Sequence, residues 1–260
     1  MSVLLFASEN QELEDKIAQE TATHLGYKTL NHTFLDEIAQ QYDLDPSKLR
    51  EAMVSPPSIL RRMPSKLWHY YLSCVETAVL DRLLADDLVC WGLGAHLYVL
   101  VVSHVLKVRL VGGDGSASMT DTKKERRREK WSVAAWQRRE ADPRLYDLVI
   151  NLDQIKSDEA VTTVAATVGY PRFKPMTYSK SNLTDRAMAA KVKNVLLKTL
   201  TDIHVHAQNG TVVVTTSCLK REKTKKIATI KEIAGQVEGM GYLEVHWNVD
   251  PVSEAASSDR

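Results

Sequence analysis

Short apolar runs alternate with amphipathic segments along the first two thirds of the chain. Residues 2–6 (SVLLF) form the first apolar run, and residues 12–25 follow with apolar side chains near helical spacing. Further amphipathic segments separate three later apolar runs, LVCWG, VLKVRLV and YDLVINL. Buried parallel strands appear as continuous apolar runs between helices. The pattern therefore predicts a three-layer α/β domain over residues 1–168, with SVLLF central in a parallel sheet covered by helices on both faces.

The segment from Leu88 to Leu106 has two interpretations. It carries no Asp, Glu, Lys or Arg and is about long enough to cross a bilayer. Taken alone, it is compatible with a membrane-spanning helix. The GLG break, two histidines and a second half rich in valine instead favour two buried strands joined by a short helix. We expect the two-strand arrangement.

A second, smaller domain follows a predicted linker. Residues 169–180 contain two prolines and few apolar side chains, which is typical of a linker. Over residues 181–250 the pattern predicts helix, hairpin, helix and strand, an α+β unit of αββαβ order with its hairpin turn at Asn209-Gly210. We expect the tail, residues 251–260, to be disordered.

Composition narrows the class of protein without identifying it. The chain has 34 Lys and Arg against 33 Asp and Glu, so its net charge produces no overall positive field that would attract nucleic acid. We therefore expect no nucleic-acid partner. Cys74, Cys90 and Cys218 are far apart and form neither a disulfide framework nor a zinc motif. The first residues lack the basic region of a secretory signal. These features predict a cytoplasmic protein.

Several ordered motifs in residues 3–168 resemble the cytidylate-kinase-like group of P-loop nucleoside monophosphate kinases. IAQETATHLGY is similar to the family's IAxxLAxxLGY, and VCWGLGAHLYV to its strand and turn of the type VIVGRGANYIL. VLKVRLV resembles the next strand of the family. The most specific match is DPRLYDLVINLDQIKSDEAV, which resembles DPxLYDLVINTxxLsxEEAV. The resemblance implies a P-loop kinase fold.

The resemblance fails where the family binds phosphate. The family's glycine-rich loop cradles phosphate with backbone N–H groups and adds a basic residue. Here the glycines are replaced by Gln11, Leu13 and Glu14, and the basic residue by Asp15. Carboxylates at this position would repel a polyphosphate. The sequence therefore predicts a degenerate phosphate loop, although an acidic helix N-terminus favoured by the helix dipole is an alternative reading of the same residues.

Two other segments occupy positions at which the family binds its ligands. In the turn Gly92-Leu93-Gly94, Leu93 replaces the arginine that the family uses on the nucleotide, and the glycines also suit a purely structural turn. The basic run after residue 122 corresponds to the family's lid. Its guanidinium and ammonium groups could hold an anion, although a solvated helix face is the favoured interpretation. The candidate lid residues are Lys123, Arg126, Arg127, Lys130, Arg138 and Arg139.

The second domain resembles the BON family. LTDRAMAAKVKNVLL is similar to the family's first helix, NGTVVVTTS to its dGxVxLxG hairpin, and IKEIAGQVEGMGYLEV to its last helix and strand, with Thr216 in place of the second hairpin glycine. This resemblance implies ligand or membrane-surface binding. Five basic residues form a candidate patch for an acidic partner such as a phospholipid headgroup, with a solvated turn as the alternative: Lys220, Arg221, Lys223, Lys225 and Lys226.

Two functions follow from these features. The favoured hypothesis is a catalytically inactive kinase-like domain that binds a small anionic ligand or a protein partner and acts with the BON-like module as a sensor or regulator. It has no catalytic residues, no metal and no cofactor. The alternative is an active nucleoside monophosphate kinase that uses ATP and Mg²⁺ with an altered phosphate loop. The histidines His204, His206 and His246 are predicted to be surface residues of strands, and a homo-oligomer is left open.

Overall fold

The chain forms two compact units, Met1–Lys180 and Ser181–Arg260. The computed structural model describes the backbone of residues 2–61, 63–113 and 119–249, and their side chains except those of residues 61, 119–125 and 249. The predicted disordered tail therefore lies outside the described residues.

A five-stranded parallel sheet forms the centre of the first unit, as the sequence predicts. Its strand order is β2-β3-β1-β4-β5, so the apolar run at the N-terminus is the central strand. Val3 pairs with Leu88 on one side and Val105 on the other. The strands are β1 (Val3–Ser8), β2 (Lys28–Leu30), β3 (Leu88–Cys90), β4 (Val105–Val111) and β5 (Leu148–Asn151).

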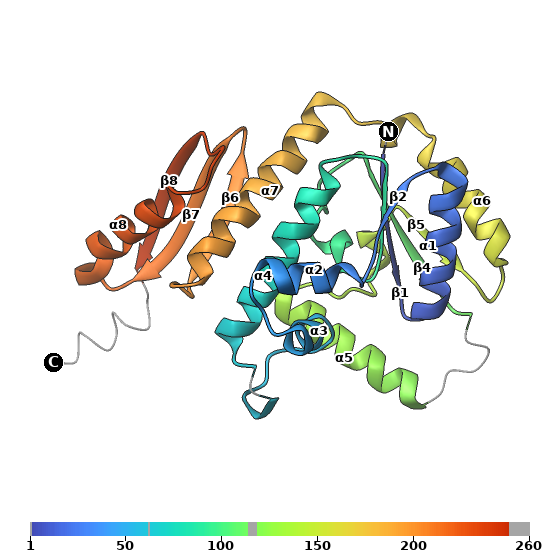
Figure 1. Cartoon of the computed structure of the whole chain (residues 1–260), viewed down its shortest axis with the longest axis horizontal. Coiled ribbons are helices and arrows are strands. Elements are labelled where there is room, and N and C mark those ends of the chain that lie inside the picture. Colours follow the sequence, from blue (N-terminus) through green and yellow to red (C-terminus); the bar gives the residue numbers. More distant parts are fainter. Residues whose placement is uncertain (1, 62, 114–118, 250–260) are drawn as a thin grey trace. The chain divides into compact units, whose positions relative to one another are not determined.

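Helices cover both faces of this sheet (Figure 1). On one face, α1 and α6 contribute Ile17, Ala160 and Val164 to a core that includes Leu4 and Phe6 of β1. Figure 1 shows α4 and α2 on the other side of the strands. The helices are α1 (Gln11–Leu25), α2 (Phe34–Gln41), α3 (Pro46–Val54), α4 (Ser65–Leu83), α5 (Met119–Trp136) and α6 (Ser157–Val168).

Local signals in the sequence set the ends of several helices. The side chain of Asn10 caps α1 by accepting a hydrogen bond from the Leu13 N–H at 3.1 Å, and Gly26 ends the helix with a φ of 68°. Asp45 caps α3, with Pro46 at its first position. At the start of α6 the Glu159 carboxylate accepts a hydrogen bond from the Lys156 N–H at 3.1 Å.

The segment Leu88–Leu106 folds as two strands rather than as one helix. It contains β3, a short 3-10 helix η2 (Ala95–Leu97) and the start of β4, and its residues are mostly buried in the first unit. The two-strand interpretation is therefore confirmed. Among the described residues, no helix has the length and apolar character that crossing a membrane requires.

The segment predicted as a linker is more structured than the sequence suggests. Residues 169–180 contain the 3-10 helix η4 (Pro171–Phe173) and the start of α7 (Thr177–Leu197). Phe173 is only 3% exposed and belongs to the core of the first unit, and its carbonyl accepts a hydrogen bond from the Ser2 hydroxyl. A segment with two prolines and few apolar side chains therefore still packs on the first unit, through the aromatic side chain of Phe173.

The second unit has the predicted αββαβ order. β6 (Ile203–Gln208) is antiparallel to β7 (Thr211–Cys218), and β8 (Tyr242–Val249) pairs with β7 in parallel after α8 (Lys223–Ala234). Asn209 and Gly210 both have positive φ, 51° and 77°, as a two-residue hairpin turn requires. The Asp185 carboxylate accepts hydrogen bonds from both of their N–H groups, at 2.7 and 3.0 Å.

Candidate functional site

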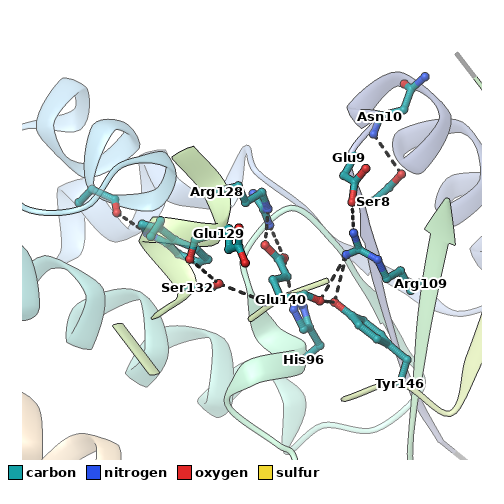
Figure 2. Close-up of polar contacts among 12 residues, drawn as sticks. Ser8, Glu9, Asn10, His96, Arg109, Arg128, Glu129, Ser132, Glu140 and Tyr146 are labelled. Atoms are coloured by element: carbon teal, nitrogen blue, oxygen red, sulfur yellow. Dashed lines mark hydrogen bonds and ion pairs between the residues drawn. The ribbon is translucent and has the colours of Figure 1, made fainter. Parts of the chain in front are cut away.

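The candidate site lies at the carboxyl ends of the central strands. The connection after β1 leads towards β2 on one side, and β4 lies on the other side of β1. Ligands of open parallel sheets bind where neighbouring connections diverge in this way. Glu9 follows β1 directly, and Arg109 belongs to β4, so the two side chains meet at this point (Figure 2).

Arg109 is a buried cation with a complete set of partners. Its side chain is 6% exposed and forms an ion pair with Glu9. Its Nη1 lies 3.4 Å from the Glu140 carbonyl oxygen and 3.4 Å from the Tyr146 hydroxyl. Figure 2 shows the guanidinium group between Glu9 and Tyr146, whose ring centroid lies 5.6 Å away. The side chain is therefore neutralised and held in place from two sides.

Glu140 joins a second buried ion pair to this cluster. Arg128 of α5 donates to its two carboxylate oxygens at 2.5 and 2.7 Å, and His96 Nε2 lies 3.3 Å from Oε1. Burial opposes ionisation of Glu140, but Arg128 and His96 outweigh it and lower the pKa of its carboxyl group well below the usual range. Burial lowers the pKa of His96, although Glu140 opposes this shift. His96 is therefore neutral at physiological pH.

Glu14 is the exceptional carboxyl group of the site. It lies in the first turn of α1 and is 5% exposed. Burial raises its pKa from 4.5 to about 8, and the attraction of Arg128 only partly offsets this shift. The backbone N–H of Gly92 also donates to it. Glu14 is therefore mostly protonated at neutral pH and acts there as a neutral polar side chain.

Two hollows flank Arg128 at this end of the sheet. The first encloses about 170 Å³ and is strongly charged, with Glu9, Arg109, Arg126, Arg128, Glu129 and Glu140 in its wall. The second encloses about 240 Å³ and combines polar and apolar groups, including Glu14, His32, Leu35, Arg50, Met53 and Gly92. Glu9 and Arg128 border both hollows. The arrangement offers a polar ligand two adjacent compartments with one shared cation.

The residues at the predicted phosphate loop belong to helix α1. Gln11, Leu13, Glu14 and Asp15 all lie in its first five residues, and only Glu9 and Asn10 separate the helix from β1. Gln11 and Glu14 line the second hollow. Asp15 accepts a hydrogen bond from the Trp91 indole N–H at 2.5 Å and lies 3.7 Å from His32 Nδ1.

The turn Gly92-Leu93-Gly94 places the side chain of Leu93 in the core of the first unit. Gly92 and Gly94 have φ values of 70° and 69°, which favour glycine. Leu93 is fully buried, and its carbonyl accepts a hydrogen bond from the Tyr98 hydroxyl at 2.8 Å. Gly92 borders the second hollow, but Leu93 does not line either one. Of these three candidate ligand residues, the described geometry brings only Gly92 to the site.

Only three of the predicted lid residues lie together. Arg126, Arg127 and Lys130 line a groove beside Pro56 and Leu60, and Arg126 also lines the first hollow. The other contacts of the candidates differ. Arg127 donates to the Ser55 hydroxyl, Arg139 pairs with Glu129 at 3.1 Å, Arg138 is exposed, and the side chain of Lys123 lies outside the described residues.

Sequence reasoning missed the residues that the structure brings together. Arg128 lies inside the predicted basic run but is not one of the predicted lid residues. Arg109, Glu140 and His96 belong to none of the predicted sites. One signal was present. Lys107 and Arg109 alternate with buried apolar residues in β4, and charged groups on an otherwise apolar strand indicate buried partners.

The basic patch of the second unit is partly occupied by local contacts. Lys223 lies 4.5 Å from the centroid of the Trp247 ring, and Lys226 donates to the Ser217 carbonyl at 2.7 Å. Lys220 and Arg221 belong to the 3-10 helix η5 (Lys220–Glu222), and Lys225 is exposed on α8.

The strand histidines lie on one sheet face of the second unit. Both His204 and His246 pair with Thr215, and His206 is the next outward residue of β6. His204, His206 and His246 are exposed, as expected. Among the described residues, no group of three or more His, Cys, Asp or Glu side chains has the geometry to hold a metal ion.

Comparison with known proteins adds little to this geometry. No family profile matches the chain, and no curated protein matches it. A solved structure of an uncharacterized protein from Eubacterium ventriosum aligns with a TM-score of 0.45 at 13% identity. The alignment covers 65% of this chain and 98% of that one. A likeness this distant carries no argument about function.

Proposed function

We propose that the first unit is a catalytically inactive relative of the P-loop nucleoside monophosphate kinases. In this proposal it binds a small anionic ligand or a protein partner and acts with a BON-like second unit as a sensor or regulator. One observation carries the proposal: the first turns of α1 stand where the proposed fold would have its phosphate loop. The ion pair that neutralises the nearby cation Arg109 with Glu9 supports it.

The backbone at the start of α1 supports the loss of phosphate binding. A glycine-rich loop binds phosphate by directing successive free N–H groups at its oxygens. Here the Asn10 side chain already accepts the N–H of Leu13, and the Ser8 hydroxyl accepts that of Asn10 at 3.1 Å. The side chains of Gln11 and Glu14 line the hollow beside the helix end, where a glycine-rich loop would present backbone alone. A polyphosphate would therefore lose the backbone contacts that such a loop supplies.

The charges of the site support the same conclusion. Arg109 pairs with Glu9, and Arg128 pairs with Glu140, so the cations nearest to β1 are neutralised inside the protein. A phosphate group at this end of the sheet would have to displace a carboxylate. Repulsion between unit charges about 4 Å apart is about 4 kcal/mol near a protein surface. Polyphosphate binding at this position is therefore unfavourable, whereas a smaller ligand could use one of the hollows.

The second unit supports the regulatory part of the proposal. Its αββαβ order, its Asn209-Gly210 hairpin and its parallel final strand agree with the resemblance to the BON family. Binding is the role that this resemblance implies. The exposed Lys225 and its basic neighbours are the proposed contact with an acidic partner, for which a phospholipid headgroup is one candidate.

Calorimetric titration of the whole chain with ATP and Mg²⁺ tests the inactive state. We expect no binding in the micromolar range, and micromolar affinity would instead favour the active kinase. A variant with Gln11→Gly, Leu13→Gly, Glu14→Gly and Asp15→Lys tests whether these four positions account for the loss of phosphate binding. Each glycine should lower the stability of the helix by about 1 kcal/mol, and removal of the buried Glu14 carboxyl group should offset this loss at neutral pH. The variant should gain ATP affinity that falls with salt.

The role of Glu9 is tested with pyrophosphate as the probe. Glu9→Gln releases Arg109 from its ion pair, and a charged hydrogen bond contributes about 1.5–3 kcal/mol. The variant should therefore bind pyrophosphate at least about tenfold more tightly than wild type. Glu12→Gln is the matched control, because Glu12 is an exposed carboxylate in the first turn of the helix that follows Glu9. Equal affinities in all three proteins would contradict the proposed electrostatic block.

A further inference from the structure

The connection between α3 and α4 exposes two adjacent aliphatic side chains. Ile59 is 86% exposed and Leu60 is 98% exposed, the two highest values among the large hydrophobic residues described. Both belong to the 3-10 helix η1 (Ile59–Arg61). Single exposed apolar residues are common on protein surfaces. Two neighbours with almost complete exposure form an apolar tip, which we call the Ile59-Leu60 tip.

The tip is held on a closed and stiff loop. The Ser58 N–H donates to the Met63 carbonyl at 2.8 Å, and the Met63 N–H donates back to the Ser58 carbonyl at 3.0 Å. Met63 is 2% exposed and anchors the base of the loop in the first unit. Prolines 56, 57 and 64 restrict the backbone on both sides. The loop that carries the tip is therefore closed at its base, and Figure 1 shows this loop beyond the N-terminal end of α4.

A basic groove lies directly beside this tip. Leu60, Pro56 and Pro57 line one part of it, and Arg126, Arg127 and Lys130 of α5 line the other. No acidic side chain of the described residues borders this groove. Arg126 and Lys130 are exposed, and Arg127 is oriented by its hydrogen bond to the Ser55 hydroxyl. A protruding apolar tip is thus placed next to three positive charges.

We propose that the Ile59-Leu60 tip and the basic groove dock the first unit on an anionic membrane surface. The tip enters the boundary between headgroups and acyl chains, and the three cations lie among the lipid phosphates. Charge complementarity determines this choice of partner, because apolar insertion combined with basic residues is the mode by which proteins bind anionic bilayers. The convex shape fits a bilayer, which deforms around a small tip, better than it fits a preformed protein pocket.

The two parts of the surface contribute comparably to binding. Each basic residue near an anionic surface contributes about 1 kcal/mol, which is about fivefold in affinity. Replacing both Arg126 and Lys130 by Ala should therefore weaken binding by about 25-fold. Replacing Ile59 and Leu60 by Ser should weaken it by about tenfold or more, because two aliphatic side chains lose their insertion. Neither pair is buried, so the fold should be unaffected.

Vesicle flotation of the whole chain tests this proposal. The vesicles contain phosphatidylcholine alone or phosphatidylcholine with about one third phosphatidylglycerol, at low and at physiological salt. We expect flotation only with the anionic vesicles, weaker at higher salt, and reduced in both double variants. The apolar control is Val101→Ser, which changes a side chain with 60% exposure elsewhere in the unit. The charge control is Lys28→Ala with Lys174→Ala, which removes two exposed cations away from the groove.

Three results would overturn the proposal. The first is no binding to anionic vesicles. The second is binding that survives both double variants but is lost in Lys225→Ala with Lys223→Ala, which would assign the membrane contact to the second unit. The third is a wild-type oligomer, seen by light scattering, that Ile59→Ser with Leu60→Ser converts to a monomer, which would make the tip a contact between protein chains. The proposal does not depend on the inactive-kinase proposal, so either can fail alone.

Discussion

Replacing Glu14 by Gln tests whether a buried carboxyl group at the start of α1 destabilises the folded protein above neutral pH. Glu14 is 5% exposed, and burial raises its pKa from 4.5 to about 8. Between these two values the folded protein retains the proton, whereas the unfolded chain has lost it. The unfolded state then binds fewer protons, so the free energy of unfolding falls as pH rises, by about 1.4 kcal/mol per pH unit.

The size of this effect follows from the shift in pKa. The full penalty, reached above pH 8, is about 5 kcal/mol, which is a large fraction of a typical stability of about 5–15 kcal/mol. Glutamine is nearly the same size, is neutral at every pH and can accept the Gly92 N–H. The advantage of Glu14→Gln over wild type should therefore increase from about 1 kcal/mol at pH 5 to about 3 at pH 7 and about 5 at pH 9.

Urea unfolding at pH 5, 7 and 9 measures this advantage. The fluorescence of Trp68 and Trp131, both fully buried in the first unit, reports its unfolding. The matched control is Glu12→Gln, an exposed carboxylate of the same turn, which should lose about 0.3–1 kcal/mol of dipole stabilisation at all three pH values. The reasoning is refuted if the advantage of Glu14→Gln is constant with pH, or if Glu12→Gln shows the same increase.

Three other replacements test single contacts. Because burial lowers the pKa of His96, the unfolded chain binds a proton first as pH falls below about 6.5, and stability is lost in acid. His96→Gln should make the loss of stability between pH 7 and pH 5, measured by the urea midpoint, smaller than in wild type. An equal change of the midpoint in both proteins would contradict this prediction. Asp147→Leu leaves the Lys107 ammonium group buried without its partner at 2.9 Å and should lower the stability by about 3–5 kcal/mol. The double variant with Lys107→Met should recover most of this stability, as measured by thermal unfolding. Asp185→Ala removes the acceptor of two turn N–H groups and should lower the free energy of unfolding by about 1–3 kcal/mol. The loss should appear as faster amide hydrogen exchange in β6 and β7, and an unchanged exchange rate would contradict it.

The layered fold was predictable because its signals are local. Continuous apolar runs identified the buried strands, and the Asn209-Gly210 pair identified the hairpin through the positive φ that both residues need. Asp45 and Pro46 are also a local signal, because adjacent capping and proline residues mark the start of α3. The packing of residues 169–180 had no comparable local signal, since it depends on the contact of one aromatic residue, Phe173, with the distant core of the first unit.

The candidate site was only partly predictable because its members are distant in sequence. The sequence alone places several carboxylates directly after the first strand and a run of cations between residues 123 and 130. Which of these charges meet depends on the folded chain. Helical rotation turns Arg128 towards Glu140 and Arg127 towards the opposite groove, and strand order brings Arg109 to Glu9 across 100 positions. Charge pairing and burial depend on these long-range contacts, so the pKa of Glu14 and the exposure of Ile59 and Leu60 were fixed only when the chain folded.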